Sequence, residues 1–173
     1  MRRLLTVFVV VLSAATLLAE SAGGLHWTAP PGWKAGPPQT MRAATYAVEA
    51  APGDTAKSEC VVYFFGAGQG GSVDANIERW QGQFTSPSGK PATPIVGKHS
   101  VHGIAMTTID VVGAYSGLGG PTAPSTPVPG YRLLGAIVEG PGGNVFVKFA
   151  GPAKTIAANK AKFDQLLASF MKG

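Results

Sequence analysis

A glycine-rich segment has the spacing in this sequence that points most directly to chemistry. The pattern Gly66-x-Gly68-x-x-Gly71 lies between an apolar run and a region of helical spacing. A dinucleotide fingerprint places its glycines in this way, so that the backbone approaches a pyrophosphate at a helix start. However, no Asp or Glu occurs between Arg79 and Ile109, so the acid that would bind a ribose is missing. We interpret the segment as a loop that leads into a helix, with a simple anion at the helix start as the alternative, and we predict no cofactor.

Polar residues follow these glycines at a spacing that places them together. Asn76, Arg79 and Gln83 are three and four residues apart, so they would share one side of a helix. One interpretation is a recognition strip. The other, which we favour, is that Arg79 packs its stem along a sheet and fixes a loop by hydrogen bonds. The candidate binding residues are therefore Gly68, Gly70, Gly71, Asn76, Arg79 and Gln83.

The histidines give little support to a metal site. His99 and His102 are three residues apart, and Val101 and the adjacent glycines favour an extended segment. In a strand, an odd spacing places two side chains on opposite faces, where they could not share a metal ion. We predict that the protein binds no metal.

Nucleophilic catalysis also lacks a local motif. No serine lies in the Gly-x-Ser-x-Gly elbow of an α/β-hydrolase. Asp74 and Glu78, four residues apart on the predicted helix, are typical of a solvated helix face. A Ser-His-Asp set could still assemble in space from a serine, His99 and Asp110. We predict no enzymatic activity and no catalytic residue, with a small exported hydrolase as the alternative.

The single cysteine, Cys60, lies inside the apolar run of residues 60–65. A chain with one cysteine forms no internal disulfide. Because the neighbours are apolar, we expect Cys60 to be a small buried hydrophobic residue rather than a reactive thiol.

Two periodicities define the elements that must position these residues. Strand-like patterns predict strands over residues 25–28, 41–50, 59–65, 104–112, 131–139 and 144–150, with 99–102 also extended, and the run 59–65 is apolar on both faces. Apolar residues at helical spacing predict helices over 73–85 and from 152 towards the C-terminus. Consecutive strands without helical crossovers indicate an α+β fold, a mainly antiparallel sheet of about six strands flanked by helices on both faces. Residues 116–130, rich in Pro and Gly, are predicted to form a flexible or functional loop.

The first 22 residues are typical of a secretory signal peptide. Two arginines precede 16 uncharged residues, from Leu4 to Ala19, and this run is shorter than the roughly 20 residues that span a bilayer. We expect cleavage after Ala19 or Ala22, with Ala22 favoured. Residues 23–173 then form a single domain with no transmembrane segment. The net charge is +5, but the basic residues are dispersed, so we predict no nucleic-acid binding.

Several motifs together resemble the PsbP/Mog1-like α/β/α sandwich. They are Trp27-x-x-Pro30-x-x-Trp33, the hairpin 131–150, Gly151-Pro152 and the terminal stretch Leu166-Leu167-Ala168-Ser169-Phe170. Further motifs resemble uncharacterised exported bacterial proteins: Met41-Arg42, Gly70-Gly71, Asn76-Ile77-x-Arg79-Trp80-x-x-Gln83-Phe84 and Gly130-Tyr131. Members of the wider group serve as extrinsic or accessory proteins, so the resemblance implies a fold and little about activity.

These observations together predict an exported, non-enzymatic accessory or binding protein of the cell envelope, located in the periplasm or outside the cell. Its partner would be another envelope protein or an unknown ligand. A purely structural envelope protein without a specific ligand is a further possibility.

Overall fold

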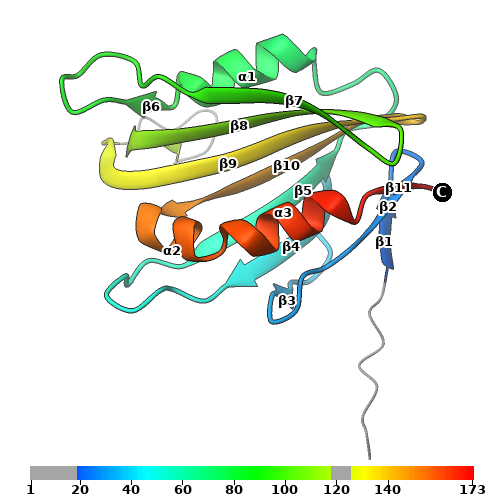
Figure 1. The fold of residues 1–173 in the computed structure, drawn as a ribbon, viewed down its shortest axis with the longest axis horizontal. Helices are drawn as coiled ribbons and strands as arrows, with labels where there is room; N and C mark the ends of the chain where they lie inside the picture. Colours follow the sequence, from blue (N-terminus) through cyan, green and yellow to red (C-terminus); the bar gives the residue numbers. More distant parts are fainter. Residues whose placement is uncertain (1–18, 118–125) are drawn as a thin grey trace, which may run out of the picture.

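Antiparallel strands form most of the regular secondary structure in the described residues. The computed structural model describes residues 19–117 and 126–173, which form two sheets (Figure 1). The larger sheet has the strand order β3 (Lys34–Ala35), β4 (Arg42–Val48), β5 (Ser58–Phe64), β10 (Gly143–Pro152), β9 (Val128–Gly140), β8 (Ile104–Tyr115) and β6 (Phe84–Thr85), and β7 (Ile95–Val101) also pairs with β8. The smaller sheet has the order β1 (Ala19–Ala22), β2 (Leu25–Thr28) and β11 (Met171–Lys172). Every pairing of these named strands is antiparallel, as predicted.

The number of strands differs from the prediction. Among the described residues, the larger sheet has eight strands rather than about six, and three further strands form the smaller sheet. The additional strands are mostly pieces of two to four residues, such as β3, β6 and β11, which are too short to show an alternating pattern in the sequence. The six predicted strands are all present, with β8 and β9 extended to 12 and 13 residues.

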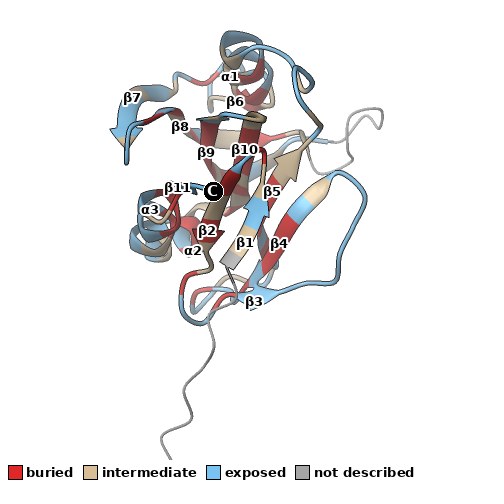
Figure 2. Cartoon of the chain, turned by 90° about the vertical axis from the view of Figure 1, so that its right-hand side faces the viewer, coloured by how far each residue is buried: buried red, intermediate tan, exposed pale blue. Residues whose placement is uncertain are grey.

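Alternate residues of the central strands belong to two apolar clusters. In β9, Leu134, Ala136 and Val138 pack in one cluster, together with residues of α2 (Ala153–Ala158) and α3 (Lys160–Ala168). The intervening Leu133 and Ile137 pack in the other cluster with Trp80 of α1 (Val73–Gln81). Figure 2 shows buried residues concentrated on β9 and β10, which are in the middle of the sheet. Cys60 of β5 is fully buried in the first cluster, as predicted, and burial raises its pKa.

Both predicted helices end at different residues. Helix α1 begins after Ser72, whose hydroxyl accepts from the Ala75 N–H, but it ends at Gln81 rather than near Thr85. Gly82 closes it by donating to the Glu78 carbonyl, and Phe84 then lies buried in the short strand β6. Phe84 would point towards the core if the helix continued to residue 85, and it also does so in the short strand β6. The spacing of apolar residues therefore could not show where the helix ends.

The predicted C-terminal helix is two helices, because Asn159 has a non-helical backbone between α2 and α3. The Asn159 side chain donates to the Thr155 carbonyl and accepts from the Trp33 indole N–H, 3.3 Å away. Pro152 is the N-cap of α2 rather than its first helical residue. No described helix is long and apolar enough to cross a membrane.

Two predicted boundaries fall at the limits of the described chain. The last three residues of the predicted loop 116–130 belong to β9. The β8–β9 register is irregular there, because Val128 pairs with Tyr115 and Tyr131 pairs with Gly113. Gly130, between these pairs, has φ of +74°. Residues 118–125 of that loop and 1–18 of the predicted signal peptide lie outside the described residues. The predicted domain start at residue 23 lies within the β1–β2 hairpin, in which Ala22 pairs with Leu25.

Candidate functional site

The glycine-rich loop after β5 has a backbone that only glycine adopts without strain. Gly70 has φ of +87°, in the left-handed region. A Cβ atom at Gly70 would lie 2.6 Å from the Phe146 ring and 2.8 Å from the Phe65 ring. This glycine therefore lets the loop pass directly over two aromatic side chains of the sheet.

Asn76 connects the loop to helix α1. Its side chain is almost fully buried, and its Nδ2 donates to the carbonyls of Gly70 and Ser72, both at 2.8 Å. Its Oδ1 accepts from the Arg79 guanidinium. Asn76, rather than Arg79 as we had favoured, is thus the residue that fixes the loop.

The loop, the end of β5 and helix α1 enclose an open groove of about 650 Å³, which we call the glycine-loop groove. Its lining residues are Met41, Phe64, Phe65, Gln69, Gly70, Gly71 and Arg79. The groove therefore brings together three of the six candidate residues, and Asn76 supports two of them, Gly70 and Arg79. Gly68 lies in the same loop, with open space around it.

Exposed apolar groups form one wall of the glycine-loop groove. Met41 is 63% exposed and Phe65 is 37% exposed. Met41 also has φ of +64°, a conformation that costs about 1–2 kcal/mol for a residue other than glycine. Phe65 stacks on Tyr63 at 5.9 Å between ring centroids, and the Arg42 guanidinium lies 5.8 Å from the Tyr63 ring. An exposed methionine held in a strained backbone is a feature found at functional sites.

Gln83 lies outside the groove and contacts a lysine that the sequence analysis missed. The Lys148 Nζ donates to the Gln83 Oε1 at 2.8 Å and to the Tyr115 Oη at 3.0 Å. We call these three residues the Lys148 cluster. Lys148 is the only charged residue in β10, between Val147 and Phe149, and that interruption is the signal that the sequence offered.

The charge of Lys148 has no acidic counterpart among the described residues. Burial, and secondly the nearby Arg79, lower the pKa of Lys148 to about 8. Burial raises the pKa of Tyr115 to about 12, so its hydroxyl keeps its proton at neutral pH. Arg79 likewise forms no ion pair with a described acid. The cluster therefore joins a lysine that can lose its proton near pH 8 to neutral hydrogen-bonding groups.

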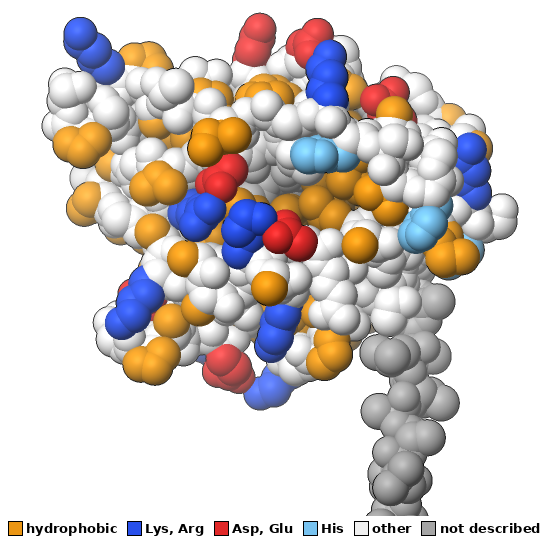
Figure 3. All heavy atoms as spheres, in the orientation of Figure 1, with side chains coloured by type: hydrophobic (Ala, Val, Ile, Leu, Met, Phe, Trp, Pro, Cys, Tyr) orange, Lys and Arg blue, Asp and Glu red, His pale blue; other side chains and the backbone are white. Residues whose placement is uncertain are grey.

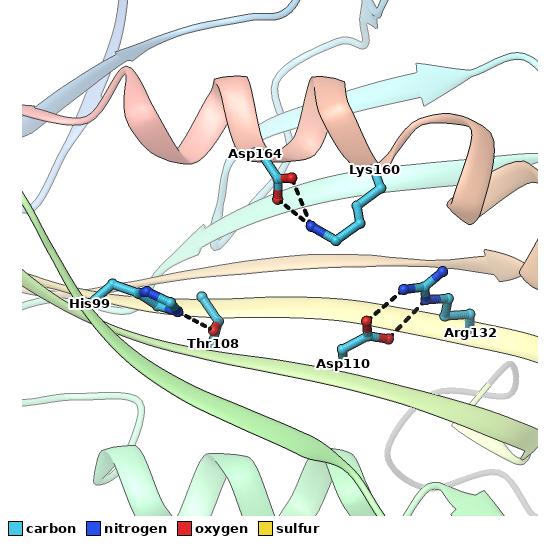
Figure 4. Close-up of polar contacts among 6 residues, drawn as sticks. All are labelled: His99, Thr108, Asp110, Arg132, Lys160 and Asp164. Carbon is cyan, nitrogen blue, oxygen red and sulfur yellow. Dashed lines mark hydrogen bonds and ion pairs between the residues drawn. The ribbon is translucent and has the colours of Figure 1, made fainter.

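The histidines lie apart from this cluster. His99, on β7, has its Nε2 3.0 Å from the Thr108 hydroxyl, as Figure 4 shows. His102 lies in the β7–β8 turn with φ of +49°, and its Nδ1 is 2.9 Å from the Phe170 carbonyl. Within the described residues, no group of three or more His, Cys, Asp or Glu side chains is placed to hold a metal ion.

Asp110 is engaged by an arginine rather than by His99. The Arg132 Nε and Nη2 donate to the two carboxylate oxygens at 2.8 and 2.5 Å (Figure 4). Figure 3 shows acidic and basic side chains intermixed on this face of the molecule. His99 instead lines a smaller cavity of about 280 Å³, with Val73, Asp74, Lys98, Ala105, Met106, Thr107 and Glu139. No serine belongs to this described lining, so the Ser-His-Asp combination that we considered is not assembled there.

The overall structure is similar to that of two proteins of known structure. One is PA94, a protein of unknown function from Pseudomonas aeruginosa, at a TM-score of 0.54 and 11% identity, covering 92% of this chain and 99% of that one. The other is the cyanobacterial PsbP (CyanoP) from Synechocystis sp. PCC 6803, at a TM-score of 0.55 and 12% identity, covering 94% and 95% respectively. No protein-family model and no curated protein matches the sequence.

These similarities establish a PsbP-like fold over most of the chain, as the sequence motifs predicted. At 11–12% identity they concern the fold alone. Function must therefore be argued from the groove and the cluster.

Proposed function

We propose that this PsbP-like domain is an exported, non-enzymatic binding protein of the cell envelope that holds a segment of a partner protein in the glycine-loop groove. One observation carries the proposal. The groove combines two exposed apolar side chains, Met41 and Phe65, with the Arg79 guanidinium, which has no acidic partner among the described residues. Exposed apolar groups beside an arginine are typical of protein recognition surfaces.

The chemistry of the groove indicates the kind of segment that fits. Apolar side chains of the partner would pack on Met41 and Phe65, and a carboxylate would pair with Arg79. Asn76 holds both Gly70 and Arg79 in place, so this side of the groove loses little conformational entropy when a partner binds. The predicted signal peptide supports the location, since export would present the groove to other envelope proteins.

Site-specific photo-cross-linking in the envelope tests this proposal. A photoreactive residue replaces Phe65 in one variant and Met41 in a second. The matched control position is Val112 on β8, which is 55% exposed and outside the groove. We expect the same protein to be cross-linked from positions 65 and 41 but not from 112. We also expect the charge reversal Arg79→Glu to reduce the yield by about tenfold.

Two results would contradict the proposal. One is an identical set of cross-links from all three positions, which would indicate nonspecific contact. The other is an unchanged yield in the Arg79→Glu variant, which would remove the groove as the contact.

A further inference from the structure

We infer that Lys148, Gln83 and Tyr115 form a binding site for a small oxyanion, either a carboxylate or a phosphate. The site is separate from the proposed contact of a protein partner in the glycine-loop groove, because none of the three residues lines that groove. It can therefore be tested on the isolated protein.

The Lys148 cluster has more hydrogen-bond donors than its internal contacts use. Lys148 uses two of its three ammonium hydrogens on Gln83 Oε1 and Tyr115 Oη. These bonds use one acceptor position on each oxygen and leave several donors: the third ammonium hydrogen, the Tyr115 hydroxyl hydrogen and the Gln83 amide NH₂. Among the described residues, none of these hydrogens has an acceptor. A group of donors without an acceptor matches an oxyanion.

The charge of the cluster is the second argument. A partly buried ammonium without a counter-ion is unfavourable, and its partners here are neutral. Glu59, on the neighbouring strand β5, pairs with Arg42, and Asp110 pairs with Arg132. Arg79 adds a second positive charge near Lys148. An anion would supply the missing counter-charge.

The surrounding residues hold the cluster in place. Tyr115 stacks on Phe84 and on Tyr131, with ring centroids 4.8 and 5.7 Å away. The Gln83 carbonyl accepts from the backbone N–H and the hydroxyl of Ser116, at 3.0 and 3.1 Å. A donor set fixed before binding loses little entropy on capturing an anion.

Anion titration of the purified mature chain tests the inference. The probes are acetate, benzoate and inorganic phosphate, and the readout is the NMR signal of the Gln83 side-chain amide NH₂, which is present in the wild type and in both variants. The test variant is Lys148→Met, which keeps the length of the side chain and removes the charge. The matched control is Lys98→Met, on exposed β7. A near-ultraviolet circular dichroism spectrum confirms that each variant is folded.

We expect saturable shifts of the Gln83 amide signal in the wild type and in Lys98→Met, with the same affinity, and no saturable shift in Lys148→Met. Tighter binding of benzoate would assign the site to carboxylates, and tighter binding of phosphate would assign it to phosphates; either result supports the inference. Absence of saturable shifts with all three probes would overturn it. Binding that survives in Lys148→Met would overturn it equally.

The dependence on pH gives an independent readout. The charged or titratable groups near Lys148 are Arg79 from α1 and Tyr115 from β8, and Tyr115 is in turn close to Tyr131 of β9 and Tyr63 of β5. Because the pKa of Lys148 is about 8, loss of its proton should weaken acetate binding about thirtyfold between about pH 6.5 and about pH 9.5. An acetate affinity that stays constant over this range would contradict the inference.

Discussion

Arg132 and Lys148 lie on the neighbouring strands β9 and β10, but only Arg132 has an acidic partner among the described residues. Arg132 makes a two-pronged ion pair with Asp110, and Figure 4 shows the two side chains directed at each other across β8 and β9. Lys148, partly buried on the opposite face, contacts only the neutral Gln83 and Tyr115. The charge of Arg132 is therefore balanced by Asp110, whereas no described acid balances the charge of Lys148.

The largest expected effect is a dependence of stability on pH. Lysine has a pKa near 10.5 in the unfolded chain and about 8 at Lys148 in the folded protein. Between these values the unfolded state binds more protons at this lysine, so the contribution of Lys148 to the free energy of unfolding should rise with pH, by up to roughly 3 kcal/mol. Urea unfolding from about pH 7.5 to about pH 10.5 measures it, with Lys148→Met as the reference. A constant difference between the two proteins over this range would show that Lys148 does not titrate in this window.

Removing the partner of Arg132 should give the next largest effect. Asp110→Asn leaves the guanidinium, whose side chain is 19% exposed, without its counter-charge. We expect a loss of about 2 kcal/mol in the free energy of unfolding at neutral pH, measured in urea. Asp164→Asn is the matched control, because the exposed Lys160–Asp164 pair contributes at most about 0.5 kcal/mol. Equal losses in both variants would mean that burial does not distinguish the two ion pairs.

Lys148→Met should change stability in the other direction. At neutral pH it removes a charge that has no counter-ion and keeps an apolar stem of similar length. We expect a gain of about 1 kcal/mol in the free energy of unfolding, because the lost hydrogen bonds to Gln83 and Tyr115 offset part of the benefit. A decrease in the free energy of unfolding would instead show that Lys148 stabilises the fold, as we expect of Arg132.

Glu20 is an acidic residue whose hydrogen-bond partner is neutral, as the partners of the basic Lys148 are. Its carboxylate accepts from the Tyr46 hydroxyl, which in turn accepts from the Trp27 indole N–H at 2.8 Å. Signal cleavage after Ala22 would remove this acceptor and strand β1, at a cost of about 1 kcal/mol for the hydrogen bond. The sequence favours cleavage after Ala22, whereas cleavage after Ala19 would keep the acceptor and β1. The intact mass of the mature protein, beginning at Gly23 or at Glu20, distinguishes the two sites. A mass that begins at Gly23 would show that the fold forms without β1.

Local sequence was informative wherever burial or backbone conformation determined the residue. Cys60 was predicted to be buried because its neighbours are apolar, and it is. Gly70 was recognised as part of a loop, and its positive φ and contact with Phe146 explain why it is glycine. The end of helix α1 was predicted wrongly, because a helix and a short strand direct Phe84 to the same side.

The candidate sites were only partly predictable from the sequence. The motif around Asn76 and Arg79 lies within one helix and its preceding loop, so its spacing gave the correct neighbourhood, although the roles of the two residues were exchanged. Gln83 was identified as polar and close to that motif. Its partner Lys148 was missed, because it is 65 residues further along the chain.

Sequence alone thus determined which residues are apolar, which loop is rich in glycine and where the longer strands and the two helical regions occur, because these properties depend on neighbours within a few residues. Tertiary structure alone decided which charges are balanced. Antiparallel pairing brings Asp110 to Arg132 and places Lys148 beneath Tyr115 and Gln83, over separations of 22, 33 and 65 residues. No local pattern encodes such contacts, because they depend on the order of strands in the sheet and on the packing of α1.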